Sequence, residues 1–555
     1  MEIKTLSPSI SVSAQIAATD IPAIAQAGFK SVICNRPDGE GADQPGFKEI
    51  EAAANQAGLQ IRYLPAESGK VSDAQGEEFG RLMQELPKPV LAYCRTGMRS
   101  TTMWALANAG QIALPALIEI SAKAGYDLKG LVRRILNGGK TPVEVADASH
   151  EVVIVGGGTA GIAVASSLLA RNPNLDIAIV DPADIHYYQP GWTLVGAGVF
   201  EPGFTARTMA AVLPQGVHWI KSAVAAFEPE RNAIILDGCR VVRYKQLVVC
   251  PGLKLDWNAI EGLSETLGRN GVTSNYRYDL APYTWQLVQQ LRGGKAIFTQ
   301  PPMPIKCAGA PQKAMYLSAD HWKRQGVLKD VDIQFCNAGA VLFGVADYVP
   351  ALMEYVKAYG IGLNFGRTLV AIDGAARKAT FSQGKPDGSK ETLTQDFDMI
   401  HVVPPQRAPD FIRVSPLADT AGWIDVDPAT LRHKVHANIF AMGDVTNTTN
   451  AKTAAAARKQ APVVAHNLLA TRGEAQGEAQ YDGYGSCPLT VERGKIVLAE
   501  FTYGGKLAPS FPKWLIDGTK PSALAWYLKE RILPPLYWDA MLKGREWLAK
   551  PEMVG

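Results

Sequence analysis

Short apolar runs alternate along this chain with longer segments in which apolar residues recur every three or four positions. Because strands that alternate with helices favour a parallel sheet, residues 1–140 are predicted to form a small α/β domain. Its strand-like runs are "FKSVICNRP", "LQIRYLPA" and "KPVLAYC", and its helix-like runs are "FKEIEAAANQAG", "AQGEEFGRLMQEL" and "TTMWALANAG".

The same alternation resumes after a break. Residues 141–150 end a polar stretch, "NGGKTPVEVADASH", which contains Gly and Pro and has no periodicity, so we predict a linker there. Residues 151–508 are predicted to form a larger α/β region with parallel sheets. Its strand-like runs are "EVVIV", "LDIAIVDP", "YKQLVVCPG", "GKAIFTQ", "VDIQFC", "DMIHVVPP" and "NIFAMGDV".

Composition then limits the class of protein. The chain has 555 residues, too many for one core, and its 47% apolar and 20% charged residues are ordinary for a soluble protein. A net charge of +3 argues against a nucleic-acid partner. No run of about 18 apolar residues is present, and the N-terminus lacks the apolar core of a signal peptide. We therefore expect a cytoplasmic protein without a membrane span.

The seven cysteines are an odd number in a large chain, which argues against a secreted disulfide framework. None has C-x-x-C or Cys/His zinc-ligand spacing, so no metal site is expected. Cys34, Cys239 and Cys336 lie in apolar or strand-like surroundings and are interpreted as structural. Cys250 ends a strand-like run and is also interpreted as structural, with an auxiliary thiol as the alternative.

A glycine-rich loop follows the strand "EVVIV" and opens a helix. Gly156, Gly158 and Gly161 form G-x-G-x-x-G, which allows a tight turn and close approach of the backbone to a pyrophosphate. Asp181 ends the next strand, 20 residues after Gly161, where its carboxylate can accept a hydrogen bond from a ribose hydroxyl. Strand, helix and acid together predict a dinucleotide site rather than a chance glycine-rich turn.

The run "NIFAMGDVTN" decides between FAD and NAD. A strand ending in Gly443 and Asp444 before a helix is typical of the second FAD contact of two-dinucleotide flavoproteins, with Asp444 on the ribityl chain. The alternative is an aspartate that only caps the helix. We predict FAD as the cofactor and a tandem Rossmann-like flavoprotein fold over residues 151–508.

The second glycine fingerprint of such flavoproteins, which binds a nicotinamide cofactor, is replaced here. The loop after "GGKAIFTQ" reads "PPMPIKCAGAP", and proline, which lacks an N–H, cradles phosphate poorly. Electrons must therefore enter from another donor. Cys307 is the candidate, because Lys306 and a following helix N-terminus favour its thiolate. Cys487, in the predicted loop "YDGYGSCPLT", is its candidate redox partner.

Five long motifs carry a resemblance to a known family. They are "HYYQPGWTLVGAG", "PIKCAGAPQKAMYLS", "AGWIDVDPATL", "NAKTAAAA" and "YDGYGSCPLT". With them, residues 150–550 resemble the sulfide:quinone oxidoreductases, in the branch that includes the animal mitochondrial enzyme.

The resemblance implies an enzyme that oxidises hydrogen sulfide to sulfane sulfur and passes electrons through FAD to a membrane quinone. Cys307 and Cys487 would be its catalytic pair, bridged at rest by a disulfide or trisulfide, and a small thiol or sulfite would accept the sulfur. The resemblance also implies FAD contacts at Thr159, Ala160, Gln189, Val224, Lys452, Thr453, Ala454 and Ala455.

Residues 509–555 differ in character from the rest of the chain. Aromatic, apolar and basic residues in short helices broken by proline suit a lipid–water interface. We predict a peripheral, monotopic contact with the cytoplasmic side of the inner (plasma) membrane, where quinone dissolves. The alternative is packing in a core or dimer interface, which leaves homo-oligomer formation open. The aromatic residues are Trp514, Trp526, Tyr527, Tyr537, Trp538 and Trp547.

The N-terminal domain carries its own cysteine loop. In "VLAYCRTGMRST", Cys94 ends a strand, and a loop of backbone N–H groups leads to Arg99 and a helix, an arrangement that binds anions and favours a thiolate. Phosphatases of this design place Arg six positions after Cys. Arg99 is five after Cys94, the spacing of rhodanese sulfurtransferase loops.

Together with "GFKSVICNRPDGE", this loop resembles the phosphatase-like sulfurtransferase family described as beta-lactamase-hydrolase-like. Persulfide transfer by Cys94 and Arg99 is the favoured interpretation. A cysteine phosphatase, with Asp38 as its acid, and an inactive module are the alternatives.

The sequence as a whole predicts a sulfide:quinone oxidoreductase fused to a persulfide-handling domain. A type II NADH:quinone reductase is an alternative that needs the missing nicotinamide loop. A flavocytochrome-type sulfide dehydrogenase would use a haem partner instead of quinone, which the interfacial tail argues against. A sulfide or redox sensor that holds FAD without turnover is the non-enzymatic alternative.

Overall fold

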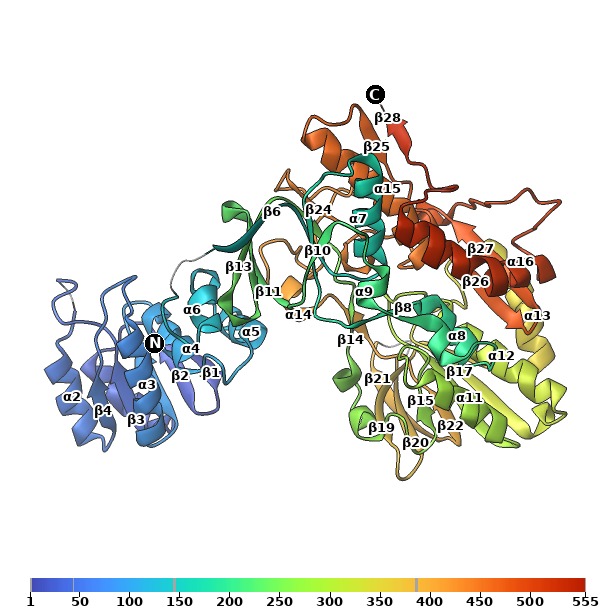
Figure 1. Ribbon diagram of the computed structural model, residues 1–555. Helices are drawn as coiled ribbons and strands as arrows, with labels where there is room; N and C mark the ends of the chain where they lie inside the picture. The colour runs from blue at the N-terminus through green and yellow to red at the C-terminus, as the bar shows by residue number, and fades with distance from the viewer. Residues whose placement is uncertain (1, 43, 143–145, 385–387, 555) are drawn as a thin grey trace. The chain divides into compact units, whose positions relative to one another are not determined.

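The structure is a computed structural model that describes residues 2–42, 44–142, 146–384 and 388–554. By its internal contacts the chain divides into two compact units, each of them α/β as predicted (Figure 1). The first unit contains Met1–Ser149, Val224–Arg243 and Val414–Pro416, and the second contains His150–Ala223, Tyr244–Arg413 and Leu417–Gly555.

The predicted linker over 141–150 is partly wrong. Strand β6 (Ala146–Val155) begins five residues before the predicted strand, and residues 143–145 lie outside the described residues. A strand depends on backbone hydrogen bonds, which polar residues make as readily as apolar ones, so the lack of apolar periodicity over 146–150 did not reveal it.

The first unit is built on a five-stranded sheet. Its strands lie in the order β1 (Ile3–Ser7), β2 (Ile10–Ser13), β5 (Val90–Tyr93), β3 (Ser31–Cys34) and β4 (Gln60–Tyr63), and only β1 and β2 are antiparallel. Its helices are α1 (Ile21–Gln26), α2 (Phe47–Gln56), α3 (Asp73–Glu85), α4 (Met98–Ala107), α5 (Leu114–Lys123) and α6 (Val132–Leu136). The hairpin of β11 (Val224–Glu228) and β12 (Ala233–Leu236) also belongs to it.

The central strands β2, β5 and β3 of this sheet bury both of their faces. Along β5, Val90 and Ala92 pack into one hydrophobic cluster, whereas Leu91 and Tyr93 pack into another. Because successive side chains of a strand point to opposite faces, the continuous apolar run requires cover on both sides. Cys94 follows at the carboxyl end of β5, where parallel α/β sheets commonly place their binding loops.

Two larger sheets lie in the second unit. One has the strand order β10 (Val217–Ile220), β7 (Ile177–Val180), β6 and β13 (Val241–Val249), with β24 (Ile439–Ala441) paired to β13. The other is parallel throughout, in the order β15 (Val272–Thr273), β22 (Met399–His401), β16 (Gly294–Gln300), β17 (Val331–Asn337) and β18 (Gly362–Phe365).

Helices and smaller sheets complete the second unit. Helices α7 (Thr159–Arg171) and α15 (Ala454–Thr471) pack against each other (Figure 1). The other main helices are α11 (Ala281–Gln290), α12 (Ala310–Arg324) and α13 (Val349–Tyr359), with short α8 (Trp192–Val195), α9 (Met209–Val212), α10 (Leu263–Thr266) and α14 (Asp410–Arg413). Four small sheets are two-stranded: β8 (Ile185–Tyr187) with β9 (Ala206–Thr208), β14 (Lys254–Leu255) with β23 (Gln406–Arg407), β25 (Glu478–Gln480) with β28 (Glu552–Val554), and β26 (Gly485–Glu492) with β27 (Lys495–Phe501). One is three-stranded, in the order β19 (Arg367–Asp373), β20 (Lys378–Gly384) and β21 (Lys390–Asp396).

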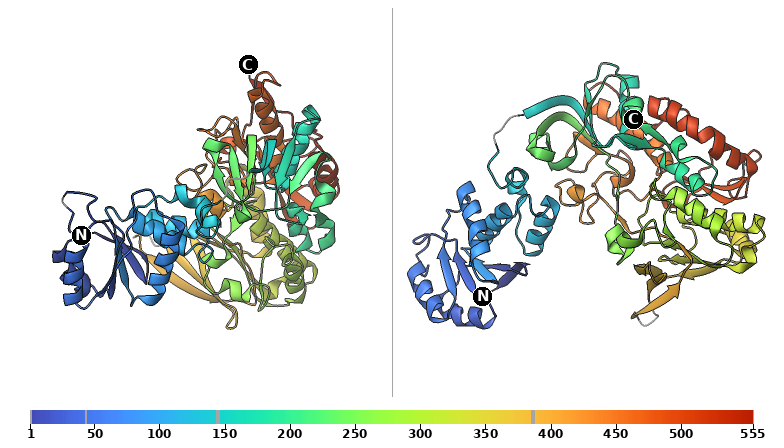
Figure 2. Two further views of the ribbon diagram at one scale, coloured as in Figure 1. Left: turned by 60° about the vertical axis from the view of Figure 1, so that its left-hand side comes forward. Right: turned by 60° about the horizontal axis from the view of Figure 1, so that its bottom comes forward.

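The tail does not form separate short helices. Residues 523–543 are helical without a break, from α16 (Ala523–Tyr527) through α17 (Leu533–Pro535), with π-helical turns next to the prolines. The right-hand view of Figure 2 shows this segment in red at the edge of the second unit. Within the described residues, no helix combines the length and the apolar character that a membrane crossing requires.

The predicted interfacial aromatics of the tail separate into two groups. Trp514, Tyr527 and Trp547 are 84%, 55% and 60% exposed. Trp526, Tyr537 and Trp538 are buried, so their prediction as interfacial residues is wrong. Composition does not reveal which side of a helix faces the core, and the tail packs its second group into the protein.

Candidate active site

The glycine loop after β6 has room for glycine only at Gly156 and Gly161. A Cβ built on Gly161 would lie 1.8 Å from the carbonyl oxygen of Gly156, and one on Gly156 would lie 2.6 Å from that of Cys250. Gly156 also has a φ of +103°. The loop therefore brings bare backbone to the N-terminus of α7, as a pyrophosphate site requires.

The predicted ribose ligand Asp181 is already engaged by the loop. Its carboxylate accepts hydrogen bonds from the N–H groups of Gly157 at 2.6 Å and Ala183 at 2.8 Å. Thr159 is bonded from another direction, because its hydroxyl lies 2.6 Å from that of Tyr537 in the tail. Gly158 and Ala160 stand at the start of α7 beside it. Contacts of these residues with a dinucleotide remain predictions.

The second predicted FAD segment follows β24. Gly443 has a φ of +75°, and its N–H donates to Gln460 of α15 at 2.8 Å. Loss of hydration raises the pKa of Asp444, and the ammonium groups of Lys452 and Lys306 oppose that rise. Asp444 does not cap α15, because Thr453 does, accepting from the N–H of Ala456 at 3.2 Å.

Lys452 lies buried between these segments. Its ammonium donates to the Thr446 carbonyl at 2.8 Å and lies 4.7 Å from the ring centre of Trp423. Burial lowers its pKa to about 8, against the pull of the Asp444 carboxylate. Ala454 and Ala455 open α15 just after the Thr453 cap.

The two predicted redox cysteines lie together. Cys307 ends the loop between β16 and α12, Cys487 lies on β26, and their sulfur atoms are 3.9 Å apart. An S–S bond is about 2.05 Å long, so both are free thiols here. The prediction of a loop at Cys487 is wrong, because residues 485–492 pair with β27 in a hairpin.

A single glycine permits this approach. A Cβ on Gly309 would lie 2.5 Å from the Cys487 sulfur and 2.4 Å from the Leu489 side chain, so any other residue would displace these two side chains. Cys307 itself has a φ of +48°, which is uncommon for a residue with a side chain. Its N–H donates to the Lys452 carbonyl at 2.8 Å, and this bond helps to hold the strained backbone.

Two buried lysines control the charge of the pair. The ammonium of Lys313 lies 3.3 Å from the Cys307 sulfur. The hydrogen bond from Cys487 and the charge of Lys313 hold the pKa of Cys307 well below its usual value, although burial alone would raise it. The same hydrogen bond, with burial and the neighbouring thiolate, raises the pKa of Cys487. Cys307 is therefore the thiolate of the pair.

Lys529 of the tail is the second lysine. It is 4% exposed and donates to the Pro190 carbonyl at 3.2 Å. Burial, with repulsion from Lys313, lowers its pKa to about 7. Sequence reasoning missed both lysines. Lys313 could have been found six residues beyond Cys307 in a matched motif, but nothing local marks Lys529.

Other predicted residues have simple surroundings. Gln189 accepts a hydrogen bond from the Lys306 ammonium at 2.6 Å. Cys250 is buried with a raised pKa, and its sulfur contacts the Gly156 carbonyl at 3.7 Å, which favours the structural interpretation. Val224 opens β11 and is grouped with the first unit, so its FAD contact remains a prediction. Cys239 lies half-buried in a turn with a φ of +63°, not in a strand.

In the first unit, the loop that follows Cys94 leaves this cysteine buried. The Gly97 N–H points at the Cys94 sulfur, 3.1 Å away, and Cys94 is fully buried. The Tyr126 hydroxyl donates to the Thr96 carbonyl at 3.2 Å, and a Cβ on Gly97 would lie only 2.0 Å from it. Tyr126 therefore covers the loop.

The guanidinium of Arg99 is already hydrogen-bonded to other groups of the protein. Both of its terminal nitrogens donate to the Glu40 carboxylate at 2.8 Å, and one also donates to the Ala66 carbonyl at 2.7 Å. This pairing lowers the pKa of Glu40. Asp38, the candidate phosphatase acid, is exposed and accepts from the N–H of Phe47 at 2.9 Å.

Comparisons with known proteins first define the class of each part. Residues 2–111 match the family described as the phosphatase-like domain of beta-lactamase hydrolase-like protein, and residues 150–284 match the pyridine nucleotide-disulphide oxidoreductases. A beta-lactamase hydrolase-like protein of Agrobacterium fabrum is 30% identical over 135 residues, 24% of this chain and 31% of that protein.

Relatives over most of the chain define the family more narrowly. The mitochondrial sulfide:quinone oxidoreductase of Dictyostelium discoideum is 42% identical over 403 residues, 72% of this chain and 87% of that protein. The one of Mus musculus is 38% identical over 71% of this chain and 87% of that protein. The solved sulfide:quinone oxidoreductase of Aquifex aeolicus has a TM-score of 0.59 at 18% identity, covering 72% of this chain and 92% of its own, and so shares the fold. The chain belongs to the sulfide:quinone oxidoreductase family, with a phosphatase-like domain at its N-terminal end.

The charge on Cys307 is predicted to depend on Lys313. Lys313→Met removes the ammonium 3.3 Å from the sulfur, so the thiolate fraction at pH 7, and with it the iodoacetamide alkylation rate of reduced Cys307, should fall about tenfold or more. Mass spectrometry of the Cys307 peptide measures the rate. Lys323→Met, an exposed lysine on the same helix, is the control, and equal rates in both variants would contradict the assignment.

Proposed function

We propose that this protein oxidises hydrogen sulfide to sulfane sulfur and passes the electrons through FAD to a quinone. The observation that supports this most is the Cys307–Cys487 pair, 3.9 Å apart, with the buried Lys313 ammonium 3.3 Å from the Cys307 sulfur. A pair held in this unequal way is suited to thiol–disulfide exchange in one direction.

The second unit fits FAD. The glycine loop would hold the pyrophosphate, because Gly156 and Gly161 leave no room for a Cβ. Asp444, whose carboxylate has lost much of its hydration, would accept hydrogen bonds from the ribityl chain. Lys452 and Gln189, with the N-terminus of α15, would hold the flavin. Bound FAD supplies an acceptor for two electrons and their path to the quinone.

The chain's own residues set the direction of the sulfur step. Sulfide attacks Cys487 in a Cys307–Cys487 disulfide, a bond forms between the sulfide sulfur and Cys487, and the old S–S bond breaks. Cys307 leaves as the thiolate, since Lys313 stabilises its charge and a more acidic thiol leaves faster. Lys529, with a pKa lowered to about 7, accepts the proton that the attacking sulfide releases. A small thiol or sulfite then removes the outer sulfur from Cys487, and the two thiols would return to the disulfide by giving two electrons to bound FAD.

Removing Cys307 tests this proposal. Cys307→Ala should retain FAD at the wild-type ratio, because the glycine loop is untouched, but anaerobic sulfide should no longer bleach the flavin. Stopped-flow absorbance measures the bleaching.

Cys336→Ala, on the buried strand β17, is the matched cysteine control and should bleach at the wild-type rate. If NADH rather than sulfide bleaches the wild-type flavin, the protein is an NADH:quinone reductase instead. A flavin that is reduced by sulfide but not reoxidised by quinone points to a sensor.

We infer a persulfide-handling role for the N-terminal domain. Support comes from Cys94 at the carboxyl end of β5, from the Gly97 N–H directed at its sulfur, and from the short spacing to Arg99. Glu40 already pairs with both terminal nitrogens of Arg99, which leaves little of the fork that binds phosphate. Cys94 is fully buried, so the loop must open before its sulfur can react.

Cys94→Ser separates the two activities. Sulfide-dependent quinone reduction should stay at the wild-type rate, while transfer of sulfane sulfur from thiosulfate or glutathione persulfide should fall at least about a hundredfold, because serine forms no persulfide. Cyanolysis of the transferred sulfur measures the second activity. Hydrolysis of p-nitrophenyl phosphate that depends on Cys94 would favour the phosphatase instead, and loss of quinone reduction would contradict the two-module assignment.

We also propose that the tail contacts the membrane from which quinone is taken. The tail exposes Trp514, Trp547 and Leu548. Exposed aromatic and aliphatic side chains beside lysines suit the headgroup region of a lipid bilayer. Trp526 and Tyr537 take no part in this contact, since they are buried.

Trp514→Ala with Trp547→Ala should weaken co-sedimentation with anionic phospholipid vesicles about tenfold or more, because two large apolar surfaces are lost. Reduction of a long-chain quinone in vesicles should fall, whereas that of a water-soluble quinone should not. Val435→Ala, which is equally exposed but outside the tail, is the control. Unchanged sedimentation would place the membrane contact elsewhere.

A further inference from the structure

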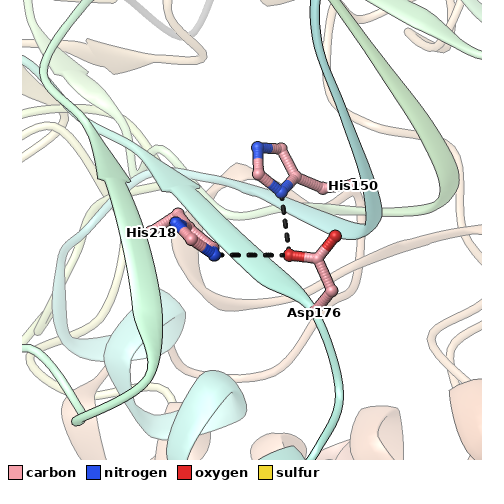
Figure 3. Close-up of side chains that lie close together, drawn as sticks. All are labelled: His150, Asp176 and His218. Carbon is pink, nitrogen blue, oxygen red and sulfur yellow. Dashed lines mark hydrogen bonds and ion pairs between the residues drawn. The ribbon is translucent and has the colours of Figure 1, made fainter.

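Three side chains in the second unit converge away from the cysteine pair. His150 lies on β6, Asp176 directly precedes β7, and His218 lies on β10, three neighbouring strands of one sheet. Figure 3 shows that both imidazoles direct a nitrogen at the same carboxylate oxygen. Their distances to Oδ1 of Asp176 are 2.9 Å from Nδ1 of His150 and 3.7 Å from Nε2 of His218.

These spacings suit a small metal ion. The three ligand atoms lie within 4.8 Å of one another. Zinc binds histidine nitrogen and carboxylate oxygen at about 2.0–2.2 Å, so tetrahedral ligands lie about 3.3 Å apart. The two distances to Asp176 lie on either side of that value, and rotation of the exposed His218 can equalise them.

The carboxylate is also held in place for such a role. The N–H of Glu151 donates to the second oxygen, Oδ2 of Asp176, at 3.3 Å, which leaves Oδ1 directed at the two histidines. Asp176 is itself fixed by its backbone, because its carbonyl accepts from the N–H of Val152 at 3.0 Å. The imidazole rings lie 5.1 Å apart between centres, close enough to share one ion.

We propose that His150, Asp176 and His218 bind one divalent transition-metal ion of the zinc class, with water in the remaining position. Two imidazoles and one carboxylate favour Zn²⁺, Co²⁺ or Ni²⁺ over Mg²⁺ and Ca²⁺, which prefer oxygen ligands. The ion joins three strands that otherwise meet through backbone hydrogen bonds. His150 precedes the glycine loop by six residues of extended chain, about 20 Å, and none of the three residues is among the contacts of Cys307 and Cys487, so sulfide oxidation should not require the metal.

Titration of the full-length, flavin-loaded protein with Co²⁺ and Zn²⁺, after treatment with EDTA and without sulfide, tests the proposal. The wild type should bind one equivalent, with weak visible Co²⁺ bands and no intense thiolate charge-transfer band. His150→Gln and His218→Gln should weaken binding at least about tenfold. Zn²⁺ should raise the wild-type unfolding temperature and leave those of both variants unchanged.

His466→Gln, a histidine elsewhere on the second unit, should bind as the wild type does. Sulfide-dependent flavin reduction should remain unchanged in all three variants, which separates this inference from the proposed oxidase function. Since His218 is exposed, its replacement does not threaten folding. Equal binding in wild type and His218→Gln, intense thiolate bands, or no saturable binding would overturn the proposal and leave the cluster as an ion pair only.

Discussion

The approach of the Cys307 loop to strand β26 is the constraint on which the second unit depends. Two sulfurs from segments 180 residues apart stand 3.9 Å from each other. Gly309 leaves the necessary space, and the Lys452 carbonyl holds the Cys307 backbone at a positive φ. The elements that would bind the flavin are therefore tied directly to the elements that carry the thiols.

Burial beside charged groups makes Cys307 and Cys487 unequal in pKa. A buried ammonium is costly unless an opposite charge lies next to it, and Lys313 has that charge in the Cys307 thiolate. Burial alone would lower the pKa of Lys313, but the thiolate more than compensates and raises it. For Lys529, burial and repulsion from Lys313 outweigh the attraction of the two cysteines, so its pKa falls to about 7. One lysine thus stays charged while the other is placed to exchange a proton.

Much of the fold could be predicted from local pattern. The glycine loop, the Gly443–Asp444 segment and the strand before Cys307 were found because each is short, and its chemistry depends on neighbours in sequence. The strand at Cys487 was not predicted, because its pairing with β27 competes with the turn preferences of "GYGSCP". The sequence also did not reveal which tail aromatics are buried, because burial depends on what covers a helix.

The sequence by itself determined the class of fold, the family, and the residue types that carry the chemistry, since strand and helix periodicity and glycine spacing are local properties. The tertiary structure alone decided which groups act on one another. The 3.9 Å cysteine contact, the placing of Lys313 and Lys529, and the convergence of His150, Asp176 and His218 all join residues distant in sequence. Such distances follow from packing, which no local pattern records.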